Sequence, residues 1–232
     1  MFYIDPLYLL FALPGLVLSL NATMYVKVTF GKYSRLRTYR GLTGAEAARQ
    51  MLEKNGIYDV KIEYANGFLG DHYDPSSKTL RLSNDVYGQS SIAAIGVACH
   101  EAGHAIQHAT GYAFLSLRTA LVPLASIGSN FSYFVFVLGL IFQSAVMLKA
   151  GCLLFACAVL FTIVTLPVEW DASARAKTAV AEAGFLNRDE QSGAASVLNA
   201  AFLTYVAGAV SALLTLLYYM FRAGLLGGRR ND

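Results

Sequence analysis

The sequence predicts a mainly α-helical integral membrane protein with four transmembrane helices and one small α+β region. First, hydrophobic residues make up 56% of the 232 residues and charged residues only 14%, whereas charged residues are about a quarter of a soluble domain. Second, four uncharged stretches approach or exceed the roughly 20 residues that cross a bilayer. Third, one polar segment of useful size, residues 27–118, lies between the first two stretches. The stretches are residues 6–26, 119–148, 150–168 and 191–221.

The first stretch is expected to be a retained N-terminal anchor. It lacks the basic start of a signal peptide, Asp5 precedes it, and no clean small-residue cleavage site stands before Lys27. A basic cluster follows it, and the preference of basic loops for the cytoplasm predicts an N-terminus outside. Four spans then place Arg222, Arg229 and Arg230 outside too, against the same rule. The larger cluster beside the first helix decides the orientation, and the side of the C-terminus stays open. That cluster is Lys27, Lys32, Arg35, Arg37 and Arg40.

The second and third stretches are expected to form a helical hairpin. Only Lys149 separates them, so the turn is predicted within residues 143–151. The fourth stretch begins with polar residues, which places the membrane part of the last helix from about Asn199 to Arg222. The predicted segments are therefore residues 1–26, 27–118, 119–168, 169–198 and 199–232.

The polar segment is predicted to begin with a short helix over residues 44–54. Thr43 and Glu46 have the spacing of a capping box at its start, and Asn55-Gly56 ends it. Because the two caps agree with the Ala-rich sequence between them, this helix is predicted from local signals alone.

A short antiparallel sheet and a second helix are predicted next. Residues 58–64 and 78–83 alternate polar and apolar side chains as strands do, and turns are predicted at Asn66-Gly67 and at residues 74–77. A helix over residues 91–110 completes the segment.

This last helix carries His100, Glu101 and His104 in the pattern H-E-x-x-H. Positions i and i+4 of a helix differ by about 40° and about 6 Å of rise, so both imidazoles can bind one zinc ion. Glu101 would lie beside the metal, where its carboxylate can take a proton from a zinc-bound water. The alternative is two polar residues on a partly buried helix. However, three of the four histidines lie on this helix, in a chain so apolar that unpaired ionisable groups are costly.

A catalytic zinc site needs a third protein ligand. In the extended pattern H-E-x-x-H-x-x-G-x-x-H, Gln107 and Thr110 stand where Gly and His are required, so that option fails. His108 lies about 12 Å along the helix from His100, too far to complete a tetrahedron. It is therefore a residue that supports a ligand, one that lines a substrate cleft, or simply a packed histidine.

Glu169 is the predicted third ligand because it follows the third uncharged stretch directly. Asp171 competes for this role, and one of the two can bind the metal while the other orients a histidine. The alternative is that both carboxylates only cap a helix.

Four segments together resemble the bacterial membrane-bound neutral zinc metallopeptidases of the YugP type, and the resemblance covers nearly the whole chain. It extends to gluzincin membrane proteases of the HtpX and Ste24 kind, in which a glutamate is the third zinc ligand. One position departs from those proteases, because Ser173 stands where they carry Asp four residues after the glutamate. This departure leaves the role of Asp171 open. The segments are residues 71–75, 78–83, 100–108 and 167–173.

The resemblance implies a zincin-like catalytic region, in which a strand before the H-E-x-x-H helix binds the substrate backbone. Residues 78–83 are the predicted substrate strand. His72 and Tyr73, in the turn before it, are candidate donors to the oxyanion or plain surface residues. Arg175 is expected to contact the substrate or to pair with Asp171.

Together these features predict a multi-pass zinc endopeptidase of the bacterial cytoplasmic membrane, with one zinc ion per chain and an active site near the cytoplasmic face. Its predicted partners are a peptide or protein substrate, the lipid bilayer and membrane protein regulators. A net charge of +3 without blocks of like charge argues against nucleic acid. The cysteines Cys99, Cys152 and Cys157 form no C-x-x-C pattern and predict no disulfide.

Two other functions remain open. An intramembrane site-2-type protease fits the apolar residues 92–98 and 113–117, but the chain has no Asn-Pro-Asp-Gly partner motif. A non-enzymatic membrane adaptor or protease regulator stabilised by zinc would use four protein ligands and no base. Glu101 therefore discriminates between an enzyme and an adaptor.

Overall fold

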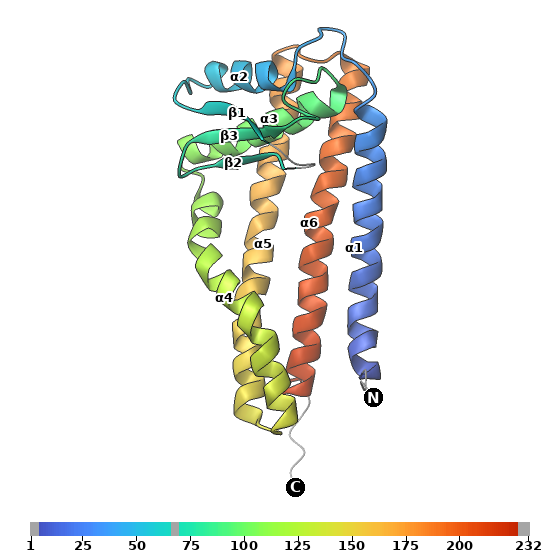
Figure 1. The fold of residues 1–232 in the computed structure, drawn as a ribbon, viewed down its shortest axis with the longest axis vertical. Helices are drawn as coiled ribbons and strands as arrows, with labels where there is room; N and C mark the ends of the chain where they lie inside the picture. The colour runs from blue at the N-terminus through green and yellow to red at the C-terminus, as the bar shows by residue number, and fades with distance from the viewer. Residues whose placement is uncertain (1–4, 66–69, 227–232) are drawn as a thin grey trace. The chain divides into compact units, whose positions relative to one another are not determined.

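The computed structural model describes residues 5–65 and 70–226, and it confirms a mostly helical chain with a small three-stranded sheet. Figure 1 shows the elements in chain order. They are α1 (Pro6–Tyr33), α2 (Gly44–Lys54), β1 (Lys61–Ala65), β2 (His72–Asp74), β3 (Thr79–Ser83), α3 (Ile92–Ala109), α4 (Ala113–Ile141), α5 (Ala145–Glu182) and α6 (Arg188–Arg222).

Four of these helices, α1, α4, α5 and α6, are long and apolar enough to cross a membrane, as predicted. The hairpin between α4 and α5 is tighter than the predicted turn at residues 143–151. Only residues 142–144 separate the helices, so Lys149 lies within α5. Three residues suffice because Gln143 adopts a positive φ of 51° and the Ser144 hydroxyl accepts a hydrogen bond from the Met147 amide.

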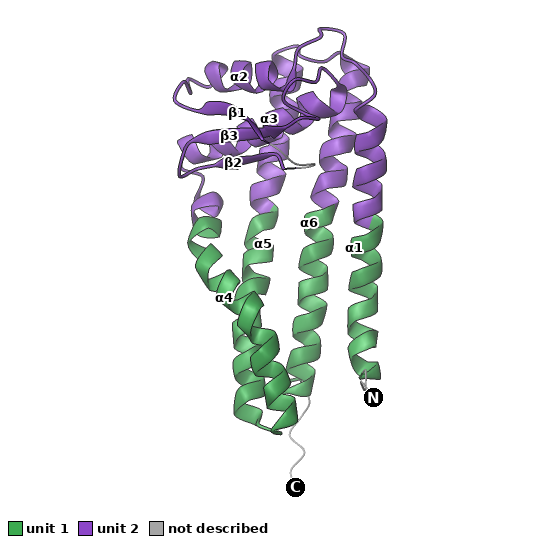
Figure 2. Ribbon diagram, in the orientation of Figure 1, with its two compact units in different colours: residues 1–21, 117–166, 204–232 green, residues 22–116, 167–203 purple. Residues whose placement is uncertain are grey.

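The chain divides into two compact units (Figure 2). The first unit consists of segments of α1, α4, α5 and α6 around an aromatic cluster, in which Phe136 stacks on Tyr219 with ring centroids 3.8 Å apart. The start of α1 and the end of α6 also meet there, since Asp5 accepts a hydrogen bond from Tyr218 and forms an ion pair with Arg222. The unit comprises residues 1–21, 117–166 and 204–232.

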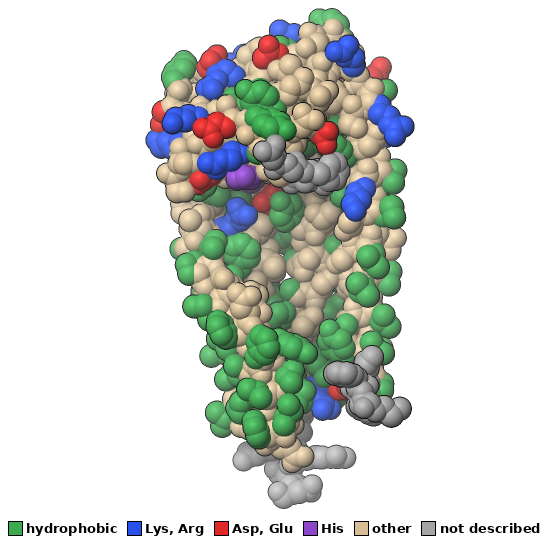
Figure 3. Space-filling model, in the orientation of Figure 1, with side chains coloured by type: hydrophobic (Ala, Val, Ile, Leu, Met, Phe, Trp, Pro, Cys, Tyr) green, Lys and Arg blue, Asp and Glu red, His purple; other side chains and the backbone are tan. Residues whose placement is uncertain are grey.

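The second unit, residues 22–116 and 167–203, contains the sheet, α2, α3 and the remaining parts of α1, α5 and α6. On the face drawn in Figure 3, most charged side chains lie over this unit, whereas the coloured side chains of the first unit are mainly hydrophobic. The predicted boundaries of α2 and α3 hold. Thr43 and Glu46 form both halves of a capping box, and Ser91 caps α3.

The sheet has the strand order β1-β3-β2. β2 and β3 are antiparallel, as expected, but β1 is parallel to β3, so the prediction of an entirely antiparallel sheet is wrong. The reason is that β2 and β3 form a hairpin, which reverses the chain, and β1 then pairs on the far side of β3. The predicted turn at Asn66-Gly67 lies outside the described residues.

The predicted substrate strand is also corrected. Residues 79–83 form the central strand, with both edges already paired, and Leu80 and Leu82 are fully buried. His72 and Tyr73 belong to edge strand β2 and not to a turn. The edge that a peptide could extend beside the H-E-x-x-H helix is therefore that of β2, which contacts α3.

Candidate metal centre

Two histidines of α3 and one glutamate of α5 converge in the second unit. The Oε2 atom of Glu169 lies 3.2 Å from Nε2 of His100 and 3.6 Å from Nε2 of His104. One ligand atom from each of the three residues lies within 4.8 Å of the others. The structure thus brings together the three ligands that the sequence analysis proposed, although they come from segments about sixty residues apart.

Burial and charge at this cluster favour a cation. Glu169 is only 2% exposed, and its neighbours at the cluster are the two imidazoles. Burial alone would lower the pKa of His104, but hydrogen bonding by Glu169 and the charges of Glu101 and Glu169 outweigh burial and raise that pKa. The cluster therefore attracts positive charge, which a divalent cation can supply to the same three ligand atoms. Two imidazole nitrogens and a carboxylate oxygen are a donor set that zinc uses.

The Nδ1 atom of each clustered histidine also has a hydrogen-bonding partner. The Ser173 hydroxyl oxygen lies 3.1 Å from Nδ1 of His100, and the Gln107 amide oxygen lies 3.0 Å from Nδ1 of His104. Such contacts orient the imidazoles of metal sites and leave the opposite nitrogen for the metal. Here the opposite nitrogens are the two Nε2 atoms that face Glu169.

Gly103 lets α3 and α5 approach closely enough to form this cluster. A Cβ atom at Gly103 would lie 2.8 Å from the backbone oxygen of Ala172, a contact too short for real side chains. Ala172 lies less than one helical turn after Glu169. The glycine within the H-E-x-x-H pattern thus has a packing reason that the pattern itself does not state.

Glu101 projects from the same helix but does not join the three-ligand cluster. It is largely buried, and its charge is near enough to raise the pKa of His104. Among the described residues, no hydrogen bond or ion pair holds its carboxylate. An unengaged carboxylate beside the ligands has the chemistry of a proton acceptor.

Asp171, the competing ligand, is directed elsewhere. Its Oδ2 atom accepts hydrogen bonds from the Gln107 side-chain amide at 2.8 Å and from Nε of Arg175 at 2.6 Å. Among the described residues, it is absent from the group that could hold a metal ion. Of the two roles considered for Arg175, the structure contains the pairing with Asp171.

The remaining candidates lie on β2 and at the end of α3. The Tyr73 hydroxyl lies 2.9 Å from Nδ1 of His108, so these two candidates meet. His72 is directed to the backbone oxygen of Gly70, 2.8 Å from its Nδ1. His108 is exposed and is not one of the three clustered ligands.

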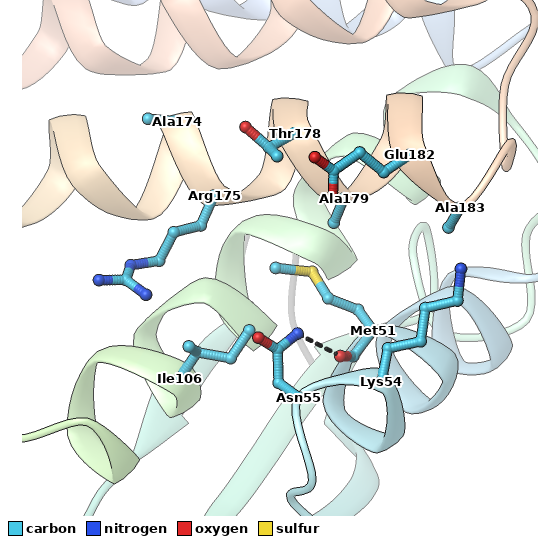
Figure 4. A pocket seen from close by; sticks show the side chains of 10 residues that line it. All are labelled: Met51, Lys54, Asn55, Ile106, Ala174, Arg175, Thr178, Ala179, Glu182 and Ala183. Carbon is cyan, nitrogen blue, oxygen red and sulfur yellow. Dashed lines mark hydrogen bonds between the residues drawn. The ribbon is translucent and has the colours of Figure 1, made fainter.

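A cavity of about 590 Å³ opens between α2, the end of α3 and α5 (Figure 4). Met51 and Ile106 contribute apolar walls, whereas Lys54, Glu182 and Arg175 contribute charges. Arg175 therefore borders the cavity while its Nε atom holds Asp171. None of the three clustered ligands lines this cavity.

Two residues of the site were not predicted as such from the sequence. Gln107 was noted only because it stands where the extended pattern requires glycine, and Ser173 only because related proteases carry Asp at its position. A signal existed for Gln107, because it lies three residues after His104 and so shares its helical face. Ser173 lies likewise four residues after Glu169, but its contact with α3 depends on tertiary packing.

Comparisons with known proteins identify the family of the chain. Residues 8–224 match the family model described as "Putative neutral zinc metallopeptidase". The chain is 43% identical over 214 residues to a Bacillus subtilis (strain 168) protein named "Putative membrane protease YugP", covering 92% of this chain and 95% of that protein. No solved structure matches the chain.

Proposed function

Because the chain belongs to the family of "putative neutral zinc metallopeptidases", we propose that it is a membrane-embedded zinc endopeptidase of the gluzincin type. His100, His104 and Glu169 are the zinc ligands, and Glu101 is the general base. The observation that carries the proposal is the convergence of three candidate ligand atoms near the carboxylate of Glu101, which has no hydrogen bond or ion pair to any other described residue.

The number of ligands supports catalysis. Structural zinc sites in proteins close with four protein ligands, whereas catalytic sites use three and keep one position open. Only three candidate ligands cluster among residues 5–65 and 70–226. This count disfavours the adaptor hypothesis, which needs a closed site and assigns no task to Glu101.

Bound zinc would supply Lewis acidity to the scissile carbonyl and to the attacking water. Glu101 takes a proton from that water as the new C–O bond forms, and it returns the proton to the amine nitrogen as the C–N bond breaks. Ser173 and Gln107 keep the two imidazoles in place through their Nδ1 atoms. The protein's own residues thus orient the two imidazoles and carry one proton, through Glu101.

The edge of β2 is the proposed peptide-binding strand, because β3 already pairs on both sides. A peptide added there would bind largely through its backbone and with little dependence on sequence. Tyr73 is the better oxyanion donor of the earlier pair, because its hydrogen is available when Nδ1 of His108 donates to the phenolic oxygen 2.9 Å away, whereas His72 spends its Nδ1 hydrogen on Gly70.

The active site is proposed to face the cytoplasm of a bacterial cell. The basic cluster from Lys27 to Arg40 occupies the end of α1 and the segment after it, and basic residues near the end of a span favour the cytoplasmic side. A site-2-type intramembrane protease is disfavoured, since α3 is not among the candidate spans of the described chain.

Proteolysis by detergent-purified protein, with unfolded casein as substrate, tests this function. We expect phenanthroline to abolish cleavage, added zinc to restore it, and Glu101→Gln to reduce the rate by at least about 100-fold while zinc remains bound. Glu53→Gln, an exposed change on α2, is the matched control and should cleave normally. Cleavage that survives chelation, or a Glu101→Gln protein of normal rate, would refute the proposal. Bound zinc without any cleavage would favour the adaptor.

A further inference from the structure

Gln107 is completely buried and sits at the centre of three hydrogen bonds. Its Nε2 atom donates to the backbone oxygen of Val168 and to Oδ2 of Asp171, each at 2.8 Å. A side-chain amide has two hydrogens on nitrogen and a carbonyl that only accepts. Both hydrogens are used on acceptors that cannot donate, so the orientation of this amide is fixed.

The fixed amide determines the state of His104. Oε1 of Gln107 lies 3.0 Å from Nδ1 of His104, and because this oxygen can only accept, Nδ1 must carry the hydrogen. A neutral imidazole has one N–H, so its lone pair is then at Nε2. Nε2 is the nitrogen that faces Glu169. The other neutral tautomer of His104 would carry its hydrogen on Nε2 and would point that hydrogen at the position of the metal.

Asp171 holds the other end of this chain of contacts. Its carboxylate accepts from Gln107 and from Arg175, one helical turn further along α5. Arg175 thereby keeps the carboxylate turned to Gln107 and away from the three clustered ligands. Within the described structure Asp171 forms no hydrogen bond or ion pair with either imidazole, so its hydrogen-bonded route to His104 runs through Gln107.

We propose that Gln107 is a positioning residue that holds His104 in its metal-binding tautomer, and that Asp171 acts on the metal centre only through Gln107. This inference rests on the proposed zinc site and adds a role for two residues that bind no metal. It also replaces the hypothesis that Asp171 is itself a ligand.

A double-mutant cycle on the full-length, detergent-solubilised protein tests the inference, with zinc affinity measured by competition against a chromophoric chelator. Gln107→Met, which keeps the length of the side chain, should weaken zinc binding by about 10- to 100-fold. Asp171→Asn should weaken it by a smaller factor. In the Gln107→Met background, Asp171→Asn should cause no further loss, because interacting residues are not additive. Gln191→Met, which removes one bond to Leu186 far along the chain, should bind zinc normally.

Each other outcome has a defined meaning. Equal zinc affinity of Gln107→Met and wild type, or a further loss on adding Asp171→Asn, would overturn the inference. Wild-type protein without zinc would instead refute the proposed function. If Gln107→Met does not fold, Asp171→Asn alone decides through the visible absorption of the cobalt-substituted protein. The inference expects weaker metal binding with the band intensity of the wild type, whereas unchanged affinity or a changed coordination number contradicts it.

Discussion

At the scale of single residues, the candidate metal centre depends on contacts to both nitrogens of each imidazole. The Nε2 atoms of His100 and His104 face Glu169, and the Nδ1 atoms face Ser173 and Gln107. A metal ligand that is held on its far side loses less rotational freedom when it binds, so these two polar residues should influence affinity without touching the metal.

Ser173→Ala should weaken zinc binding by up to about 10-fold, because it removes the hydroxyl that contacts Nδ1 of His100. Chelator competition measures the change. Ser196→Ala is the matched control, since Ser196 bonds only to the backbone of its own helix. Zinc binding as tight as in wild type would show that the hydroxyl does not orient His100.

The three clustered residues could be predicted from sequence, whereas the contacts between helices that hold them could not. His100 and His104 follow from the spacing on one helix, and Glu169 from its place after an apolar stretch together with a family resemblance. Gln107 shares the helical face of His104, but the groups that fix its amide, Val168 and Asp171, belong to α5. Ser173 reaches His100 only when α3 and α5 are in contact, and no local pattern encodes a contact between positions 73 residues apart.

At the scale of elements, the close approach of α3 and α5 decides whether the site exists. Gly103 and Ala172 lie in close contact, with no room for a side chain at Gly103. Gly96, two turns earlier on α3, faces Ala194 of α6 at an ordinary distance, since its Cβ would lie 3.5 Å from the Cβ of Ala194. Alanine substitutions at these two glycines of α3 are therefore expected to have opposite effects on stability.

Gly103→Ala should lower both the zinc content and the melting temperature, because its methyl group meets a backbone oxygen that cannot move alone. Gly96→Ala should leave the zinc content unchanged and should stabilise the helix by about 0.5–1 kcal/mol. Elemental analysis and thermal unfolding of both variants provide the comparison. Equal behaviour of the two variants would show that helix contact at Gly103 does not control the site.

Helices with local signals were predicted well, and the sheet was not. The capping residues Thr43 and Ser91 directly precede the helices that they start, so they are local signals. Strand pairing depends on contacts between distant segments, so the alternation of residues 58–64 and 78–83 could not reveal that β1 and β3 are parallel. The short β2 carries too few residues for its alternation to be recognised.

At the scale of the whole molecule, four candidate spans predict that the N-terminus and the C-terminus lie on the same side of the membrane. Within the first unit, Asp5 contacts both Tyr218 and Arg222, so the start of α1 and the end of α6 lie together. The Arg222 side chain pairs with Asp5 there, but the positive-inside rule counts Lys and Arg and gives acidic residues little weight, so the pair does not remove the conflict noted in the sequence.

Topology reporters fused to the N-terminus and to the C-terminus should therefore report the same, external side in bacterial cells. A reporter inserted in the loop after α2, near Asn55, should report the cytoplasm. Opposite sides for the two termini would contradict the arrangement of four spans. A cytoplasmic location for both termini would reverse the proposed orientation.

The most direct measurement of the central claim is the zinc content of purified protein by elemental analysis, for wild type, Glu169→Ala and Asp171→Asn. The account predicts one zinc ion per chain in the wild type, loss of that zinc in Glu169→Ala and its retention in Asp171→Asn at saturating zinc. Wild-type protein without stoichiometric metal, or Glu169→Ala protein that keeps its zinc, would contradict it.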